Sequence, residues 1–170
     1  MAPSDVSTSS PAGRYVRACE DNVYGDLGKD WRRFSVVVGP IAFVGLPGVA
    51  TRPRSEFAPD ADGFKSVKAL AVVDRGAEVT VGIPSAERAH LALVYDPTAF
   101  NTHQIAEGET SVTFRACAKG EGPWRGPTQF NGGFIVDGPQ CATIEVFDEH
   151  TGLLKHVNVA FGRGTCAKAR

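Results

Sequence analysis

The feature that most constrains the fold is a series of short apolar runs that glycine, proline and aspartate interrupt every few residues. In the run TSVTFRAC (110–117), Val112 and Phe114 alternate with polar residues, and a period of two is typical of a strand with one buried face. Residues 141–147 and 153–162 alternate in the same way. The chain has 19 glycines and 11 prolines but one methionine, and no segment carries a convincing amphipathic helix. This pattern predicts an all-β fold.

About seven to nine short strands can be placed, separated by turns, and this spacing predicts an antiparallel β-sandwich of the Ig-like or Greek-key type. Residues 66–84 are expected to form a hairpin around Asp74-Arg75-Gly76, and residues 132–147 a second one around Gly138–Gln140. A third hairpin is expected around Glu149–Gly152. The predicted inward faces are Ala142, Ile144 and Val146 on one strand and Val157, Val159 and Phe161 on the next.

A chain of 170 residues favours one domain, which we place at residues 14–170. Residues 1–13 are rich in serine, proline, glycine and alanine, and predict a flexible tail or linker. The net charge of −1 argues against nucleic-acid binding. No apolar run reaches the length of a membrane span, and residues 1–16 lack the apolar centre of a signal peptide. A signal or anchor segment is therefore not expected in this chain.

The four cysteines form no C-x-x-C pair and stand at no zinc-finger spacing from a histidine. An even number without metal spacing indicates two disulfides and export from the cell, with four buried reduced thiols as the alternative. Of the three possible pairings we favour Cys117–Cys141 with Cys19–Cys166 around it. Cys117 ends one predicted strand and Cys141 begins another, both on the polar side, so antiparallel neighbours would bring them together.

Sequence motifs of the common catalytic sites are absent, which favours a protein without enzymatic activity and without a cofactor. One polar group is a candidate metal site, because the third hairpin would place His156 opposite Glu145 with Asp148 and His150 nearby. Cross-strand polar pairs on a solvated face are common, so the metal site is the less favoured interpretation.

A candidate binding loop lies in the segment AKGEGPWRGPTQFNGG (118–133). Trp124 and Arg125 stand in its middle between glycines and prolines, and Gln129 and Asn131 follow. Tryptophan and arginine are enriched in binding hot spots, and loops on rigid scaffolds often carry function. The alternative is that Trp124 folds back to cap the core. Trp31, beside two arginines, is interpreted as a core residue.

Five stretches carry a resemblance to a known family, namely KALAVVDRGAEVTVGIP, LVYDP, TFRAC, TQFNGGFIVDGPQC and FGRGTC. Over roughly residues 30–166 the chain resembles a family of extracellular or envelope proteins from actinobacteria for which no activity is established. Members usually carry an N-terminal signal or membrane segment. The resemblance implies export and supports pairing of Cys117 with Cys141, but it supplies no catalytic residue.

Together these features predict an exported, non-enzymatic β-domain with a binding or structural role at the cell envelope or outside the cell. Its expected partners are a cell-wall glycan or another envelope protein. The alternatives are a small secreted enzyme with a metal-assisted or hydrolytic site, and a carbohydrate- or protein-recognition module that uses the Trp124 loop.

Overall fold

A computed structural model describes residues 14–123 and 125–166 of the chain. The predicted tail, residues 1–13, lies outside the described residues. The described part holds twelve strands: β1 (Arg14–Arg17), β2 (Ser35–Val38), β3 (Ile41–Val44), β4 (Ser66–Lys68), β5 (Leu70–Val73), β6 (Glu78–Gly82), β7 (Leu91–Val94), β8 (Ser111–Arg115), β9 (Thr128–Phe130), β10 (Gly133–Val136), β11 (Gln140–Asp148) and β12 (Leu153–Phe161).

Helical structure in the described part is limited to one short α-helix and six 3-10 turns. These are α1 (Leu46–Val49), η1 (Cys19–Asp21), η2 (Trp31–Phe34), η3 (Arg54–Phe57), η4 (Ser85–Glu87), η5 (Pro97–Ala99) and η6 (Ile105–Glu107). None of these helices is long and apolar enough to cross a membrane. The predicted all-β fold is confirmed, and the finer assignment to an Ig-like or Greek-key sandwich stays a prediction.

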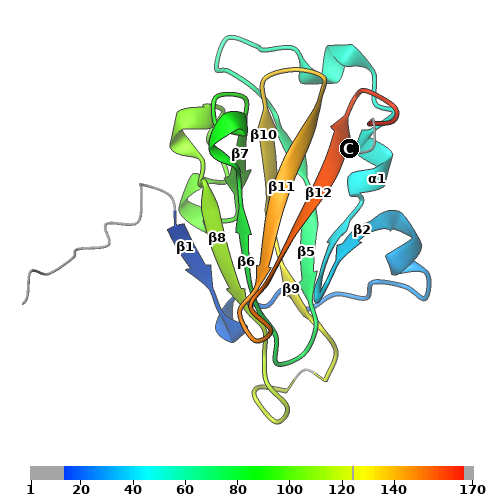
Figure 1. Cartoon of the computed structure of the whole chain (residues 1–170), viewed down its shortest axis with the longest axis vertical. Helices are drawn as coiled ribbons and strands as arrows, with labels where there is room; N and C mark the ends of the chain where they lie inside the picture. The colour runs from blue at the N-terminus through cyan, green and yellow to red at the C-terminus, as the bar shows by residue number, and fades with distance from the viewer. Residues whose placement is uncertain (1–13, 124, 167–170) are drawn as a thin grey trace, which may run out of the picture.

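The first layer is a five-stranded sheet in the order β1-β8-β6-β11-β12, antiparallel except for the parallel pair of β1 and β8. Figure 1 shows these strands side by side across the molecule, with β7, β10, β5 and β9 behind them. Alternate residues of β11, Ala142, Ile144 and Val146, are buried against the core, as predicted. On β12, Val159 and Phe161 are buried too, and Val157 is half-buried.

The second layer consists of the sheets β2-β3-β5-β9 and β4-β10-β7, which are joined end to end. Only Ala69 separates β4 from β5, and only Asn131 and Gly132 separate β9 from β10. The register does not change across this gap, and the Ala69 N–H donates to the Gly132 carbonyl at 3.0 Å. This interruption explains in part why twelve strands are found where seven to nine were expected.

Aromatic side chains join the two layers through the core. The ring centroid of Phe114 in β8 lies 5.0 Å from that of Tyr95, which directly follows β7. It lies 5.2 Å from the ring centroid of Phe130 in β9. Phe161 of β12 contacts Phe134 of β10 at 5.7 Å. All five side chains are fully buried. Because edge-to-face rings add about 1 kcal/mol per pair to their area burial, these contacts hold the layers in one relative position.

Two of the predicted hairpins are wrong, whereas the third is confirmed. β5 lies in the second layer and β6 in the first, so the turn at Asp74-Arg75-Gly76 crosses between layers. β10 and β11 are likewise in different layers, and the turn at Gly138–Gln140 crosses back. A strand that is apolar on one face can pair with its neighbour in sequence or pack against it, and alternation does not distinguish the two. The β11–β12 hairpin has the expected register, with Glu145 opposite His156.

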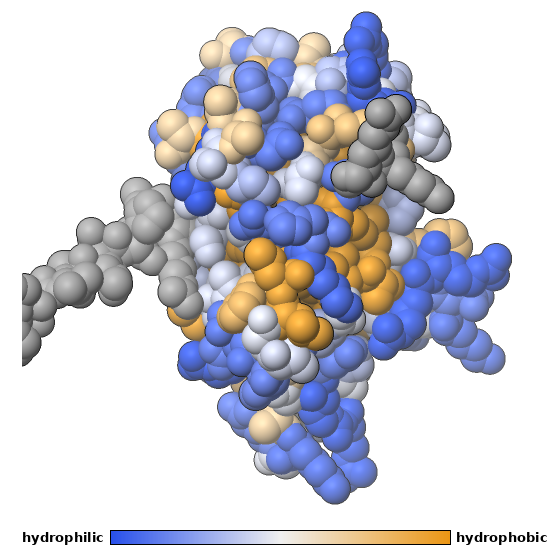
Figure 2. Space-filling view, in the orientation of Figure 1, coloured by the Kyte–Doolittle hydropathy of each residue, from blue (hydrophilic) through white to orange (hydrophobic). Residues whose placement is uncertain are grey.

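β12 is one of the two edge strands of the first layer, and β1 is the other. Figure 2 shows apolar surface on this face of the molecule among hydrophilic side chains. Exposed large apolar residues include Leu153 and Leu154 at the start of β12 and Val37 in β2, an edge strand of the other layer. Lys155 follows directly and is exposed. A lysine on an edge strand opposes pairing with a further chain, because its charge would have to be desolvated.

The disulfides are Cys19–Cys117 and Cys141–Cys166, so both favoured pairings, Cys117–Cys141 and Cys19–Cys166, are wrong. β6 lies between β8 and β11 and is antiparallel to both, so these two strands run in the same direction. The end of β8 consequently lies beside the end of β11, not its beginning. Cys117 is also buried rather than on the polar side, whereas Cys141 is exposed as expected.

A buried carboxylate, Glu109, gives the first testable prediction. Its Oε1 accepts hydrogen bonds from the backbone N–H groups of Tyr95 (3.0 Å) and Asp96 (2.5 Å), while Oε2 is buried without a partner in the described part. Burial raises the pKa of this carboxyl above its ordinary value. Its contribution to stability is therefore full below the unfolded-state pKa and is lost as the pH rises through the folded-state pKa.

We expect the melting temperature of the wild type, relative to that of Glu109→Gln, to fall as the pH rises from about 4 to about 8. The amide of the variant does not titrate, so the difference between the two proteins isolates this carboxyl. Differential scanning calorimetry of both proteins across this range is the measurement. A difference in melting temperature that stays constant, or that grows in favour of the wild type toward high pH, would show that burial does not raise the pKa of Glu109.

Candidate binding site

Three of the four residues of the predicted binding segment are described, and Gln129 and Asn131 line different pockets. Trp124 lies outside the described residues, and Arg125 beside it is exposed. Gln129 in β9 is 2% exposed and lines one pocket, and Asn131, just after β9, is exposed and lines another. Both pockets open on the outer face of the second layer, so the predicted segment does contribute to concave surface, but at two places.

The first pocket has a volume of about 540 Å³ and lies between β9 and the segment that connects η1 to η2. We call it the aromatic pocket; its lining residues are Tyr24, Gly25, Asp26, Leu27, Gly28, Trp31, Pro127 and Gln129. Its volume is in the range of small-molecule sites, and it combines apolar walls with a few polar groups, as such sites do.

The floor of the aromatic pocket is held by hydrogen bonds between β9 and residues 22–25. The backbone N–H of Gln129 donates to Asn22 Oδ1 at 2.9 Å, and the Val23 N–H donates to the Gln129 carbonyl at 2.8 Å. Gln129 Nε2 donates to the Gly25 carbonyl at 2.9 Å. Gln129 thus positions the wall of the pocket and, being buried, presents little polar surface of its own.

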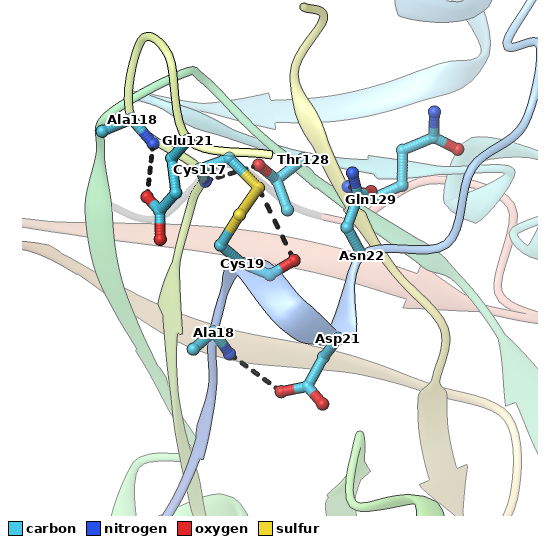
Figure 3. Close-up of a disulfide and its surroundings, with 9 residues drawn as sticks. All are labelled: Ala18, Cys19, Asp21, Asn22, Cys117, Ala118, Glu121, Thr128 and Gln129. Atoms are coloured by element: carbon cyan, nitrogen blue, oxygen red, sulfur yellow. Dashed lines mark hydrogen bonds between the residues drawn. A yellow bond between two sulfur atoms is a disulfide. The ribbon is translucent and has the colours of Figure 1, made fainter. Parts of the chain in front are cut away.

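The Cys19–Cys117 disulfide fixes the same segment at its beginning. Figure 3 shows the bridge between η1 and the end of β8, with Asn22, which follows η1, and Gln129 of β9 close by. The Cys117 N–H donates to Thr128 Oγ1 at 2.8 Å, which ties the bridge to β9 as well. The Ala18 N–H donates to Asp21 Oδ2 and closes the turn of η1. The segment that leads into the pocket is therefore held by the disulfide at Cys19 and by hydrogen bonds from residues 22–25 to β9.

The side chains that line the aromatic pocket include two aromatic rings and one carboxylate. Tyr24 is 59% exposed, and Trp31 is half-buried with the Arg32 guanidinium 4.6 Å from its ring centre. One carboxylate oxygen of Asp26 accepts from the Gly28 N–H at 2.8 Å, which fixes the orientation of the side chain. Trp31 is thus a surface residue rather than the predicted core residue.

The four candidate metal ligands do not come together. Glu145 Oε1 and His156 Nε2 are 3.3 Å apart, which confirms their predicted cross-strand pairing. Asp148 instead accepts from the backbone N–H of His150, and His150 Nε2 lies 2.9 Å from the Gly76 carbonyl oxygen. Among residues 14–123 and 125–166, no group of three or more histidine, cysteine, aspartate or glutamate side chains could hold a metal ion.

One histidine–carboxylate pair was not anticipated. His90 Nδ1 lies 2.6 Å from Asp137 Oδ2, and this hydrogen bond raises the pKa of His90. Gln140 Nε2 donates to the His90 carbonyl at 3.1 Å and joins the same turn. The pair connects η4–β7 to the turn between β10 and β11, so its geometry is that of a surface link between two loops.

Sequence reasoning missed Tyr24, Asp26 and Trp31 because it assigned no element to residues 19–32. A signal is present in YGDLGKDW (24–31), in which two aromatic residues flank a stretch with two glycines and no apolar alternation. Exposed aromatics held by turn residues are more typical of binding surfaces than of cores. Comparison of the chain with protein-family models, with curated proteins and with solved structures finds no match.

Proposed function

We propose that the protein is a non-enzymatic binding module that acts outside the cell or at the cell envelope and recognises a glycan through the aromatic pocket. The observation that carries this proposal is the presence of Tyr24, Trp31 and Asp26 in one pocket. A sugar ring has apolar C–H faces that pack on aromatic side chains, and hydroxyl groups that donate to a carboxylate. A cell-wall glycan is the proposed ligand.

The two disulfides support the location. The described part of the chain contains no free cysteine, and such bridges persist in oxidising compartments outside the cytosol. The Cys19–Cys117 bridge also serves binding, because it holds the pocket segment before a ligand arrives. A preformed site loses less conformational entropy on binding than a loop that must first be ordered.

The test is affinity electrophoresis of the purified protein in native gels that contain solubilised cell-wall glycan. Trp31→Ala should raise the dissociation constant about tenfold or more, because loss of one stacked aromatic removes a central contact of the site. Asp26→Asn should weaken binding while keeping the oxygen that accepts from Gly28.

The matched control is Phe34→Ala, since Phe34 is an aromatic residue of the same 3-10 turn, is 63% exposed and does not line the pocket. It should bind as the wild type does. The proposal fails if the wild type is not retarded by the glycan. It also fails if Trp31→Ala binds normally while Trp124→Ala does not, because the loop predicted from sequence would then be the site.

A further inference from the structure

A second pocket, of about 570 Å³, lies on the outer face of the second layer where the two sheets join. We call it the lysine pocket; it is lined by Ser66, Lys68, Leu70, Val94, Phe100, Asn101, Asn131, Gly132 and Gly133. We propose that it is a separate binding site for a small organic carboxylate with an apolar tail.

The hollow arises from a missing side chain in one row of the sheet. Gly133 pairs with Lys68 on one side and with Val94 on the other, so the residue at the centre of this row has no side chain. A Cβ on Gly133 would lie 2.0 Å from the Val67 carbonyl oxygen, so the ladder requires glycine here. The row therefore has no side chain between Lys68 and Val94, and all three residues line the pocket.

The loop that follows β7 forms the opposite wall. Its far end packs tightly on the sheet, since a Cβ on Gly108 would lie 2.6 Å from the Ala92 Cβ. Asp96 caps η5 by accepting from the Thr98 N–H at 2.9 Å, and Phe100 and Asn101 follow directly. Phe100, Leu70 and the buried Val94 supply the apolar part of the lining.

The polar part of the lining selects the sign of the ligand charge. Lys68 is the one charged residue among the described residues that line the pocket, and it is exposed. None of the ion pairs in the described part involves it. Asn101, Asn131 and Ser66 add side-chain hydrogen-bond donors. An ammonium beside neutral donors favours an anionic head group, because charge-assisted hydrogen bonds are the stronger ones.

Two carboxylates in the neighbourhood do not oppose this charge from within the pocket. Glu109 is buried on the backbone N–H groups of Tyr95 and Asp96, and Asp96 is occupied as the cap of η5. Neither lines the pocket. A single ammonium with an apolar wall fits a monoanionic head on a short alkyl tail, so a medium-chain alkyl carboxylate is the ligand class that the lining matches.

The test uses sodium octanoate as the probe. Its binding is measured by isothermal titration calorimetry at concentrations below its critical micelle concentration. The wild type should bind it saturably, and Lys68→Gln should weaken binding about tenfold, which corresponds to loss of one charge-assisted contact. Asn101→Asp, which adds a carboxylate at an exposed position of the pocket lining, should also bind octanoate more weakly than the wild type does. Lys155→Gln, on the edge of the other layer, is the matched control and should bind as the wild type does.

Octanol and octylammonium carry the same tail without the negative charge, so both should bind more weakly than octanoate. Amide NMR signals of Gly132 and Gly133 should shift on addition of octanoate. The proposal is overturned if octanoate shows no saturable binding, if Lys68→Gln binds as well as the wild type, or if octylammonium binds equally. The Lys68→Gln variant should be retarded in glycan-containing gels to the same extent as the wild type. This result would show that the two pockets bind their ligands independently.

Discussion

Replacing Cys19 and Cys117 together by serine is expected to lower the free energy of unfolding by about 4 to 5 kcal/mol. The bridge closes a sequence separation of 98 residues, and in the chain-entropy model long loops restrict the unfolded chain most. For a chain of this size the melting temperature should fall by roughly 10 °C or more. Thermal and urea denaturation, monitored by circular dichroism, measure the effect.

The matched control is the double variant Cys141→Ser/Cys166→Ser. That bridge closes a separation of 25 residues, so the expected loss is about 3.5 kcal/mol, smaller than for the long loop. Removal of the long-loop bridge should also weaken glycan binding, whereas removal of the other should not. A larger loss of stability from the Cys141–Cys166 variant would contradict this account. So would a non-reducing peptide map that finds Cys117 joined to Cys141.

Gly133→Ala should be nearly as damaging, with an expected loss of about 3 kcal/mol or more. The added Cβ would meet the Val67 carbonyl oxygen at 2.0 Å and the Lys68 Cα at 3.1 Å, and both are backbone atoms of the paired strand β4. Backbone cannot move aside as a flexible side chain does, so β4 and β10 would have to separate. Urea denaturation and hydrogen exchange at the β4–β10 amides measure this.

Gly48→Ala is the matched control for this substitution. A Cβ at Gly48 in α1 would meet nothing within 4 Å, and its backbone is not in the left-handed region. Alanine restricts the unfolded chain more than glycine does, so this variant should be as stable as the wild type or slightly more stable. If Gly133→Ala were as harmless as Gly48→Ala, the close approach of β4 to β10 in this structure would be wrong.

The sequence predicted the fold class and the inward faces well, because alternation reports directly on which side of a strand is buried. Val112 and Phe114 of β8 and Ala142 and Ile144 of β11 are buried as expected. The β11–β12 hairpin was also predictable, since the turn DEHTG stands between two long alternating runs. Local pattern determines these features without reference to the rest of the chain.

Pairing between strands was not predictable in the same way. Alternation is the same whether β5 and β6 form a hairpin or pack across the core. Because a β5–β6 hairpin was predicted, the position of β6 between β8 and β11 was not. The disulfide error followed from this, because the order of strands decides which strand ends meet. The aromatic pocket was missed for a related reason, since hydrogen bonds from β9, 104 and 107 residues away, hold its segment in place.

The most direct test of the central claim is an NMR titration of the ¹⁵N-labelled protein with solubilised cell-wall glycan. We expect shifts of the Gly25 and Gly28 amides and of the Trp31 indole N–H, while the amides of the β11–β12 hairpin stay unchanged. Absence of any shift, or shifts confined to the β11–β12 hairpin, would contradict glycan recognition by the aromatic pocket.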